Sequence, residues 1–445
     1  MAQEAVGTAP IPSAASPPPG LARRYIAAAT IGNALEFYDF ITYAFFSIQI
    51  GHAFFPTHNA YASLMLSLAT FGAGFITRPI GGLIIGSFAD RVGRKPAMML
   101  SFTMMGVAII TIAIIPPYSM IGVAAPILAV LARMVQGFSL GGEVGPTTAY
   151  LLESAPLKSR GLAVSWQGAS QGIAATLGGL VGVALSALLP PDALDAYGWR
   201  IAFLLGAVTL PFGLWIRRTL PETLHAPDPT AKASEATTRL GLAKESRRII
   251  ILALAALAAG TIGTYVFDYM TTFAQHTLHM APGVAFWAGA LGNIAAVIAV
   301  LLGGWLSDRL GRRPLMIWPN LAFLILILPG FFWIIQAHNP LVLILGTTVL
   351  GFLANLGGGA FYAALAESLP QRIRGSAFAI IYASSIALFG GTTQLVITWL
   401  IQITGDPMAP AWYLFAATCV GQVALMLILE SAPAKVLRPV AVGAT

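Results

Sequence analysis

The chain has 445 residues, of which 57% are hydrophobic and only 9% are charged, and its mean hydropathy is +0.80. Soluble domains carry roughly 25% charged residues, so this composition excludes a water-soluble globular protein. The net charge of +7 could suit nucleic acid, but the basic residues fall in short loops beside apolar segments, which indicates membrane topology and no nucleic-acid partner.

Residues 1–20 are rich in Ala, Pro and Ser and carry one charge, Glu4. We expect a disordered cytosolic tail, because a basic region and a cleavage site typical of a removable signal peptide are absent. Twelve apolar stretches follow, each near the length of about 20 residues that a helix needs to cross a bilayer. They lie near 23–50, 61–88, 97–116, 121–149, 160–189, 199–217, 248–277, 284–307, 314–336, 341–366, 374–403 and 410–431.

Each stretch is continuously apolar, without the alternation of barrel strands, so an all-α integral membrane fold is expected. The longest polar stretch, 218–247, divides the chain as a cytosolic linker. It separates an N-terminal six-helix half at 21–217 from a C-terminal six-helix half at 248–432, and residues 433–445 form a second cytosolic tail.

Two motifs recur at half-chain spacing. GSFADRVGRK at 86–95 and GWLSDRLGRR at 304–313 share the form G-x-x-x-D-R-x-G-R-[KR], 218 positions apart. ESAPLKSRG at 153–161 and ESLPQRIRG at 367–375 repeat E-S-x-P-x-x-x-R-G at a spacing of 214. The repeats predict two pseudo-symmetric halves, and a site at the midplane between such halves is a transporter architecture.

Of the 24 basic residues, only Arg200 falls in a predicted outer loop and only Arg78 and Arg133 fall inside predicted helices. The remaining 21 lie on the side that holds the N-terminus. The positive-inside rule therefore predicts a multi-pass protein of the cell (inner) membrane with both termini in the cytosol.

An ionisable group at bilayer depth is a functional candidate by default. Arg78 and Arg133 stay charged and can bind carboxylates with two parallel hydrogen bonds, so they predict a small anionic substrate. An internal salt bridge of Arg133 with Glu36 or Asp39 is the structural alternative. Polar side chains that could orient the substrate, or instead bond between helices, are Asn33, Tyr38, Gln136 and Tyr265.

The acids inside the membrane are candidates for proton coupling. Glu36 and Asp39 lie one turn apart, so they repel each other, and burial disfavours their charged forms. Asp268 is the obvious acid of the C-terminal half, and Glu143 lies deeper toward the cytosol. A fixed ion pair with a basic residue is the alternative for Glu36 and Asp39.

Asp90 and Asp308 lie at predicted helix C-termini, where a carboxylate opposes the helix dipole. We therefore expect each to point to the N-terminus of another helix or to an arginine. The arginines of the same turns are Arg91, Arg94, Arg309 and Arg312.

No nucleotide-binding motif, metal-ligand spacing or nucleophile–base arrangement is apparent in the sequence. We therefore expect no enzyme activity and no cofactor, with protons as the coupling ion. The lipid bilayer and the small anion are the expected partners, and the chain is expected to function as a monomer.

The repeated D-R-x-G-R turns resemble those of the major facilitator superfamily over residues 20–432. This resemblance implies a fold of twelve transmembrane helices, with the six residues of the two turns latching a cytosolic gate. Four segments look like the metabolite:proton symporter family: GNALEFYDF at 32–40, TRPIGG at 77–82, ARMVQGFSLGGEVGPTTAYLLESAP at 132–156 and RRTLPET at 217–223. PETLH at 221–225 departs from the P-E-S-P-R of sugar porters.

GGEVGPTTAYLLE and TYVFDYMTTFAQHTLHM look most like the citrate and tricarballylate members of that family. The resemblance implies proton-coupled import of a small carboxylate, with citrate or tricarballylate favoured. Symport of a dicarboxylate, 2-oxoglutarate, shikimate, proline or betaine is the first alternative. A drug-type exporter is the second, and a membrane receptor or membrane enzyme is an alternative of a different class.

Overall fold

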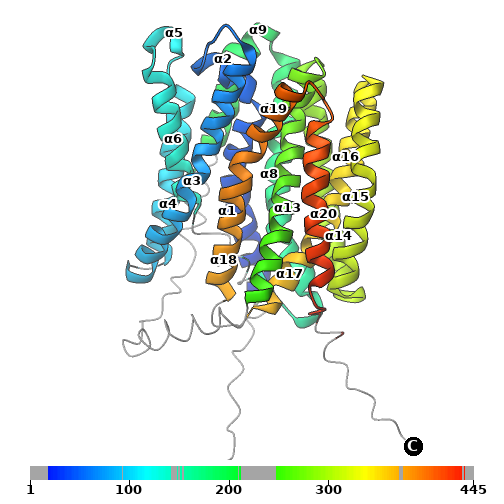
Figure 1. Ribbon diagram of the computed structural model, residues 1–445. Helices are drawn as coiled ribbons and strands as arrows, with labels where there is room; N and C mark the ends of the chain where they lie inside the picture. The colour runs from blue at the N-terminus through cyan, green and yellow to red at the C-terminus, as the bar shows by residue number, and fades with distance from the viewer. Residues whose placement is uncertain are drawn as a thin grey trace, which may run out of the picture.

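The computed structural model describes residues 19–92, 94–141, 148, 151–152, 155–208, 210–211, 247–369, 374–432 and 435. These residues form helices and short connections and contain no strand. Figure 1 shows the long helices standing side by side in one bundle. Helices satisfy their backbone hydrogen bonds internally, which is the requirement that a lipid environment imposes on a spanning segment.

The N-terminal half contains the longer helices that correspond to the first six predicted stretches. Its elements are α1 (Pro19–Phe45), α2 (Ser47–Phe54), α3 (Ala60–Val92), α4 (Arg94–Ile114), α5 (Tyr118–Ile121), α6 (Ala124–Leu140), η1 (Leu157–Ser159), α8 (Arg160–Leu188), α9 (Pro191–Ala193), η2 (Leu194–Gly198) and α10 (Trp199–Val208).

The C-terminal half contains the helices that correspond to the last six. Its elements are α13 (Arg247–Thr272), η3 (Phe273–Thr277), α14 (Pro282–Leu310), α15 (Arg312–Ala337), α16 (Pro340–Leu356), α17 (Gly358–Ser368), α18 (Arg374–Ser385), η4 (Ile386–Gly390), α19 (Gly391–Thr404) and α20 (Ala409–Leu427).

The predicted all-α membrane fold is confirmed. Among the described residues, eight helical segments are long and apolar enough to cross a membrane, and Met99–Ile114 and Ala124–Leu140 are shorter apolar helices. Helix α1 and the described part of α10 occupy the first and sixth predicted stretches.

Four predicted stretches depart from a regular α-helix. The first breaks at Phe46, between α1 and α2, and the tenth breaks at Gly357, between α16 and α17. The seventh ends in the π-helical turn η3, and the eleventh contains another, η4. Apolar composition alone does not reveal such breaks, since the residues on both sides remain hydrophobic.

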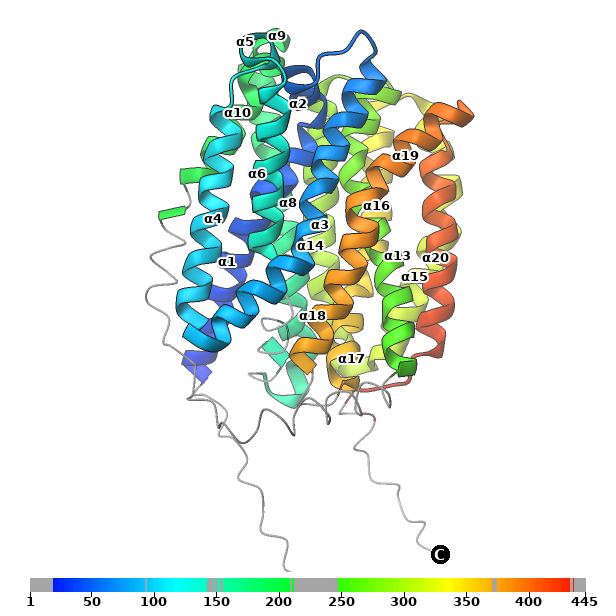
Figure 2. The ribbon, with the colours of Figure 1, turned by 60° about the vertical axis from the view of Figure 1, so that its left-hand side comes forward.

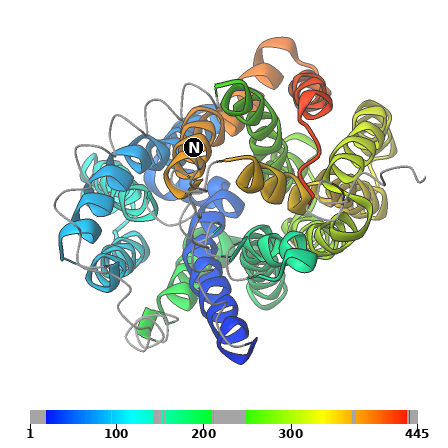
Figure 3. The same cartoon turned by 90° about the horizontal axis from the view of Figure 1, so that it is seen from below.

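The two halves meet most extensively along α8 and α14. Seen from below, the blue and cyan helices gather on one side of the molecule and the yellow and red helices on the other (Figure 3). Small residues allow the close approach: a β-carbon on Gly179 would lie 3.0 Å from the backbone of Ala290 in α14. On the opposite side of the bundle, α3 packs against α19 (Figure 2).

The second D-R-x-G-R turn forms a sharp corner between α14 and α15. Gly311 at this corner has a φ of +104°, a conformation that residues with a β-carbon rarely adopt. The backbone conformation at this corner therefore explains why the motif has a glycine here. Asp308 and Arg312 lie on either side of the corner.

Candidate functional site

Arg133 of α6 lies fully buried among aromatic rings. Its guanidinium carbon lies 4.4 Å from the centre of the Phe40 ring, 4.5 Å from that of Tyr43 and 5.1 Å from that of Phe71. The side chain has 0% exposure. Only a weakly hydrated planar cation stacks well on such surfaces, which favours arginine over lysine here.

Arg78 of α3 uses the same ring. Its guanidinium carbon lies 4.4 Å from the centre of Phe40 and 4.5 Å from that of Phe75, and the side chain is 5% exposed. Phe40, on α1, thus contacts both cations. The two arginines predicted from sequence are brought together, with one phenyl ring as their shared neighbour.

Both guanidiniums retain unused hydrogen-bond donors. Arg133 donates from Nη1 to Oε1 of Gln136 at 2.6 Å, but Nε and Nη2 have no partner in the described part of the chain. Nε and Nη2 of Arg78 are also without a partner there. The ion pair of Arg133 with Asp39 is not formed. Buried cations with free donors are costly unless an anion joins them.

Helices α3 and α6 hold the two arginines in a fixed relation. A β-carbon on Gly74 of α3 would lie 2.9 Å from the carbonyl oxygen of Arg133. Gly141, directly after α6, abuts the carbonyl oxygen of Arg78 in the same way, and Thr77 donates to the carbonyl of Met134 at 2.7 Å. These contacts leave no space for a side chain between the helices.

The C-terminal half presents phenols to this pair. Tyr265 of α13 packs edge-on against Phe75, with ring centres 5.4 Å apart, and Tyr265 and Tyr382 both interact electrostatically with Arg78. Tyr382 of α18 also accepts a hydrogen bond of 3.0 Å from Nε2 of Gln171 on α8. The predicted Tyr265 therefore lies beside the arginines, at the contact between the halves.

Two other predicted substrate ligands make interhelical hydrogen bonds. Asn33 donates from Nδ2 to Oγ of Ser170 on α8 at 2.7 Å, and the Tyr38 hydroxyl donates to the carbonyl of Ala202 on α10 at 3.1 Å. Hydrogen bonding between helices was the alternative role predicted for these side chains. Gln136 accepts a hydrogen bond from Arg133, and its role as a substrate ligand stays a prediction.

The described acids of the membrane region are Asp39 and Asp268, which are 1% and 5% exposed. Oδ1 of Asp39 has no hydrogen-bond partner within the described ranges, and the carboxyl lies against Gly206 of α10. Asp39 also interacts electrostatically with Arg133. The side chain of Glu36 and all of Glu143 lie outside the described residues.

Asp308 lies at the end of the bundle that is opposite α5 and α9. It contacts the N-terminus of another helix and an arginine, as predicted. Oδ1 accepts from the backbone N–H of Gly161 at 2.7 Å, and Oδ2 accepts from that of Leu162 at 3.0 Å. Arg312 donates to the same carboxylate at 2.7 Å. One acid therefore caps the N-terminus of α8 across the contact between the halves, and the predicted contact is confirmed.

This contact continues into residues that the sequence reasoning did not assign. Arg312 forms two hydrogen bonds with Glu367, of 2.9 and 3.2 Å, and Glu367 accepts from the hydroxyl of Ser431 at 2.8 Å. Glu367 belongs to the repeated ESLPQRIRG segment, which was a signal for it. Glu430 lies outside the repeated motifs, so no sequence pattern pointed to it.

Glu430 holds the corner of the same turn. Its carboxylate accepts the backbone N–H groups of Arg312 and Arg313, at 2.8 and 3.0 Å, and those of Ser431 and Ala432. Burial raises the pKa of this carboxyl, but these backbone hydrogen bonds outweigh burial and hold the pKa below its usual range.

The other predicted gate residues divide into two groups. Arg309 does not join the ion-pair cluster but stacks on Trp305, 3.8 Å from the ring centre. The side chains of Asp90, Arg91 and Arg94 lie outside the described residues, so their role stays a prediction.

Comparison with known proteins identifies the family. Residues 25–240 match the profile described as sugar (and other) transporter, and residues 269–442 match that of the Major Facilitator Superfamily. A citrate-proton symporter of Salmonella typhi is 35% identical over 90% of this chain and 92% of its own length. The chain belongs to the major facilitator superfamily. It is thus a multi-pass membrane transporter and not an enzyme.

Two further likenesses are to a curated relative and to a solved structure. A proline/betaine transporter of Salmonella typhimurium is 31% identical, over 95% of this chain and 87% of its own. The xylose transporter XylE of E. coli, in a partially occluded inward-open conformation, shares the fold with a TM-score of 0.74. It is 18% identical and covers 93% of this chain and 99% of its own, so it shows the fold alone.

Proposed function

We propose that this transporter is a proton-coupled symporter that imports citrate or a closely related tricarboxylate by alternating access. The observation that carries the proposal is the pair of buried guanidiniums, Arg78 and Arg133, with unused donors on both. Two carboxylates of one small anion would supply the missing acceptors. The similarity to citrate-proton symporters supports the same substrate class.

The binding of proline or betaine is the second candidate, because relatives with that name are 31% identical. A quaternary ammonium group binds on open aromatic faces. Here Phe40, Tyr43 and Phe71 already carry a guanidinium within 4.4–5.1 Å. The arrangement therefore favours an anion over a betaine.

We assign coupling to protons to the acids of α1, of which Asp39 is buried. Protonation of Asp39 at Oδ1 would neutralise a carboxylate whose oxygen lacks a donor among the described residues. Glu36 lies one turn earlier, and Asp268 is the corresponding acid of the C-terminal half. Loss of the buried charge would let the loaded transporter reorient.

The test is uptake of labelled citrate into proteoliposomes, with and without an inward proton gradient. We expect gradient-stimulated uptake, competition by tricarballylate and no competition by betaine. Arg133→Lys keeps the charge but loses the planar fork, so KM should rise about tenfold or more. Arg200→Lys is the matched control, because Arg200 also stacks on an aromatic ring, 4.2 Å from Trp199, but outside the site.

Asp39→Asn separates substrate binding from coupling. This variant should still exchange internal for external citrate, while accumulation driven by the proton gradient is lost. If Asp39→Asn accumulates citrate normally and Glu36→Gln does not, the carrier is Glu36. Absence of citrate uptake by folded protein that accumulates betaine would overturn the substrate assignment.

A further inference from the structure

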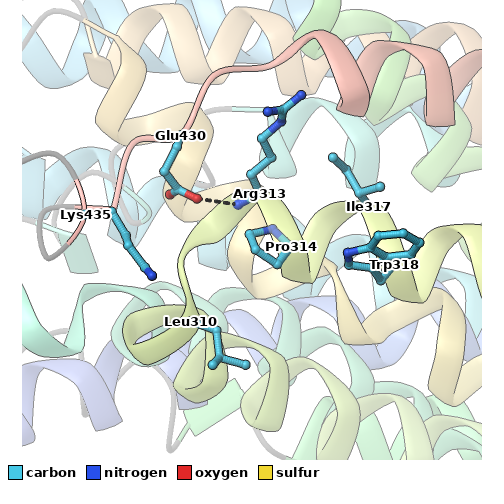
Figure 4. Close-up of a pocket in the computed structure, with 7 residues that line it drawn as sticks. All are labelled: Leu310, Arg313, Pro314, Ile317, Trp318, Glu430 and Lys435. Carbon is cyan, nitrogen blue, oxygen red and sulfur yellow. Dashed lines mark hydrogen bonds between the residues drawn. The ribbon is translucent and has the colours of Figure 1, made fainter.

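A surface groove lies beside the D-R-x-G-R corner of the C-terminal half (Figure 4). It has a volume of about 410 Å³ and lies between the end of α14, the start of α15 and the segment after α20. Its lining residues are Leu310, Arg313, Pro314, Ile317, Trp318, Glu430 and Lys435.

One wall of the groove is apolar and faces outward. Trp318 is 67% exposed and Leu310 is 53% exposed, although both are large hydrophobic side chains. On a transmembrane helix such surface contacts lipid, and tryptophan is enriched where the acyl chains meet the headgroups. Trp305 of α14, which is 39% exposed and lies under Arg309, is another exposed tryptophan of this half.

The groove also carries two cations, which come from different elements and point in different directions (Figure 4). Arg313 donates from Nη2 to the carbonyl of Met426 at 3.0 Å, which leaves its remaining donors available, and both Arg313 and Lys435 are exposed. Neither forms an ion pair within the described ranges. Glu430, the acid of this lining, uses both oxygens on backbone N–H groups.

We propose that this groove binds the headgroup of an anionic phospholipid, with Arg313 and Lys435 at the phosphate and Trp318 along the first part of the acyl chain. Basic pockets between transmembrane helices on the cytosolic side are suited to acidic headgroups. The orientation follows from the positive-inside prediction. The inference is independent of the transported substrate.

The experiment measures lipid retention by the purified full-length protein with native mass spectrometry. The probes are phosphatidylglycerol and phosphatidylcholine at equal concentration. The wild type should retain phosphatidylglycerol preferentially, and Arg313→Gln/Lys435→Gln should weaken its binding about tenfold or more. Lys158→Gln, which removes an exposed lysine predicted on the same side of the membrane, is the matched control.

A second pair of variants keeps the charge and tests the apolar wall. Trp318→Leu should weaken retention, whereas Trp333→Leu, at a 54% exposed position farther along the same helix, should not. Equal retention of the two lipids, or full retention by the folded charge variant, overturns the proposal. Displacement by soluble glycerol 3-phosphate overturns the lipid assignment and indicates a free phosphate ligand instead.

Discussion

At the scale of single residues, the site depends on one phenyl ring in contact with two guanidiniums. Phe40 is 1% exposed, and Arg78 and Arg133 each lie 4.4 Å from its centre. Like charges repel each other, but the π-surface of the ring attracts both cations and offsets part of that repulsion. We propose that the ring thereby sets the orientation of the free donors toward the anion.

Phe40→Leu tests this arrangement. The substitution removes the shared π-surface, so we expect a loss of about 1–3 kcal/mol in stability and a smaller rise of melting temperature on adding citrate. Phe331→Leu is the control, because Phe331 is also fully buried, in α15, and contacts no cation in the described structure. It should lower the melting temperature without changing the citrate-induced shift. An equal citrate-induced shift in both variants would contradict the assigned role of the ring.

Sequence identified the two cations but not the rings around them. An arginine in an apolar stretch is conspicuous, whereas Phe40 is one of 24 phenylalanines and its contacts reach across α1, α3 and α6. Asn33 and Tyr38 are also conspicuous in an apolar stretch, but the structure shows that their side chains form hydrogen bonds with neighbouring helices. Polarity marks a candidate, and only the packing shows its partner.

At the scale of helices, carboxylates cap the N-termini of two helices at one end of the molecule. Asp308 caps α8 from the other half, and Glu430 caps α15 from the segment after α20. Each supplies acceptors to N–H groups that have no partner within their own helix. The first was predictable, because its motif recurs. The second was not, since a backbone cap from a distant loop leaves no sequence pattern.

Asp308→Asn tests the cap between the halves. The amide is neutral and can accept fewer hydrogen bonds, so the contact with α8 should weaken by about 1–2 kcal/mol. We expect faster labelling of Ser165→Cys, since the Ser165 hydroxyl lies against Gly304 at the α8–α14 contact. Labelling would be measured in a Cys419→Ser background, with Asp195→Asn as the control. Unchanged labelling would exclude a role for Asp308 in closure.

Glu430→Gln tests the cap on α15 through its pH dependence. The folded-state pKa lies below the usual value of 4.5, so the stabilisation is complete above pH 4.5 and is lost as the pH falls through the folded-state pKa. The variant should therefore melt at a lower temperature than the wild type at pH 7, and the difference should shrink below pH 4.5. A difference that stays constant down to pH 3 would contradict this mechanism.

At the scale of the whole molecule, contacts between the halves occur at both ends. Near α2, Oγ of Ser47 and Oγ1 of Thr272 are 3.0 Å apart, and Gln49 donates to Gln275 at 3.3 Å. At the other end Asp308 reaches α8. The repeats predicted the two halves, but not that α8 and α14 provide their main contact.

A disulfide across the Ser47–Thr272 contact tests whether the halves separate during transport. The double variant Ser47→Cys/Thr272→Cys, in a Cys419→Ser background, should lose uptake when oxidised and regain it on reduction. The hydroxyl separation is short enough for a bridge after small side-chain adjustment. Each single cysteine variant should be insensitive to oxidation. Full transport by the cross-linked protein would exclude alternating access at this end.

The glycine contact between α3 and α6 limits how this transporter can diversify. Because Gly74 abuts the backbone of Arg133 and Gly141 that of Arg78, any larger residue at either position would push the arginines apart. Relatives that keep both glycines inherit one spacing between the cations. Adaptation to anions of other shapes would then arise by substitution on the opposing helices, at positions such as Tyr265 and Tyr382, while the cationic side stays constant.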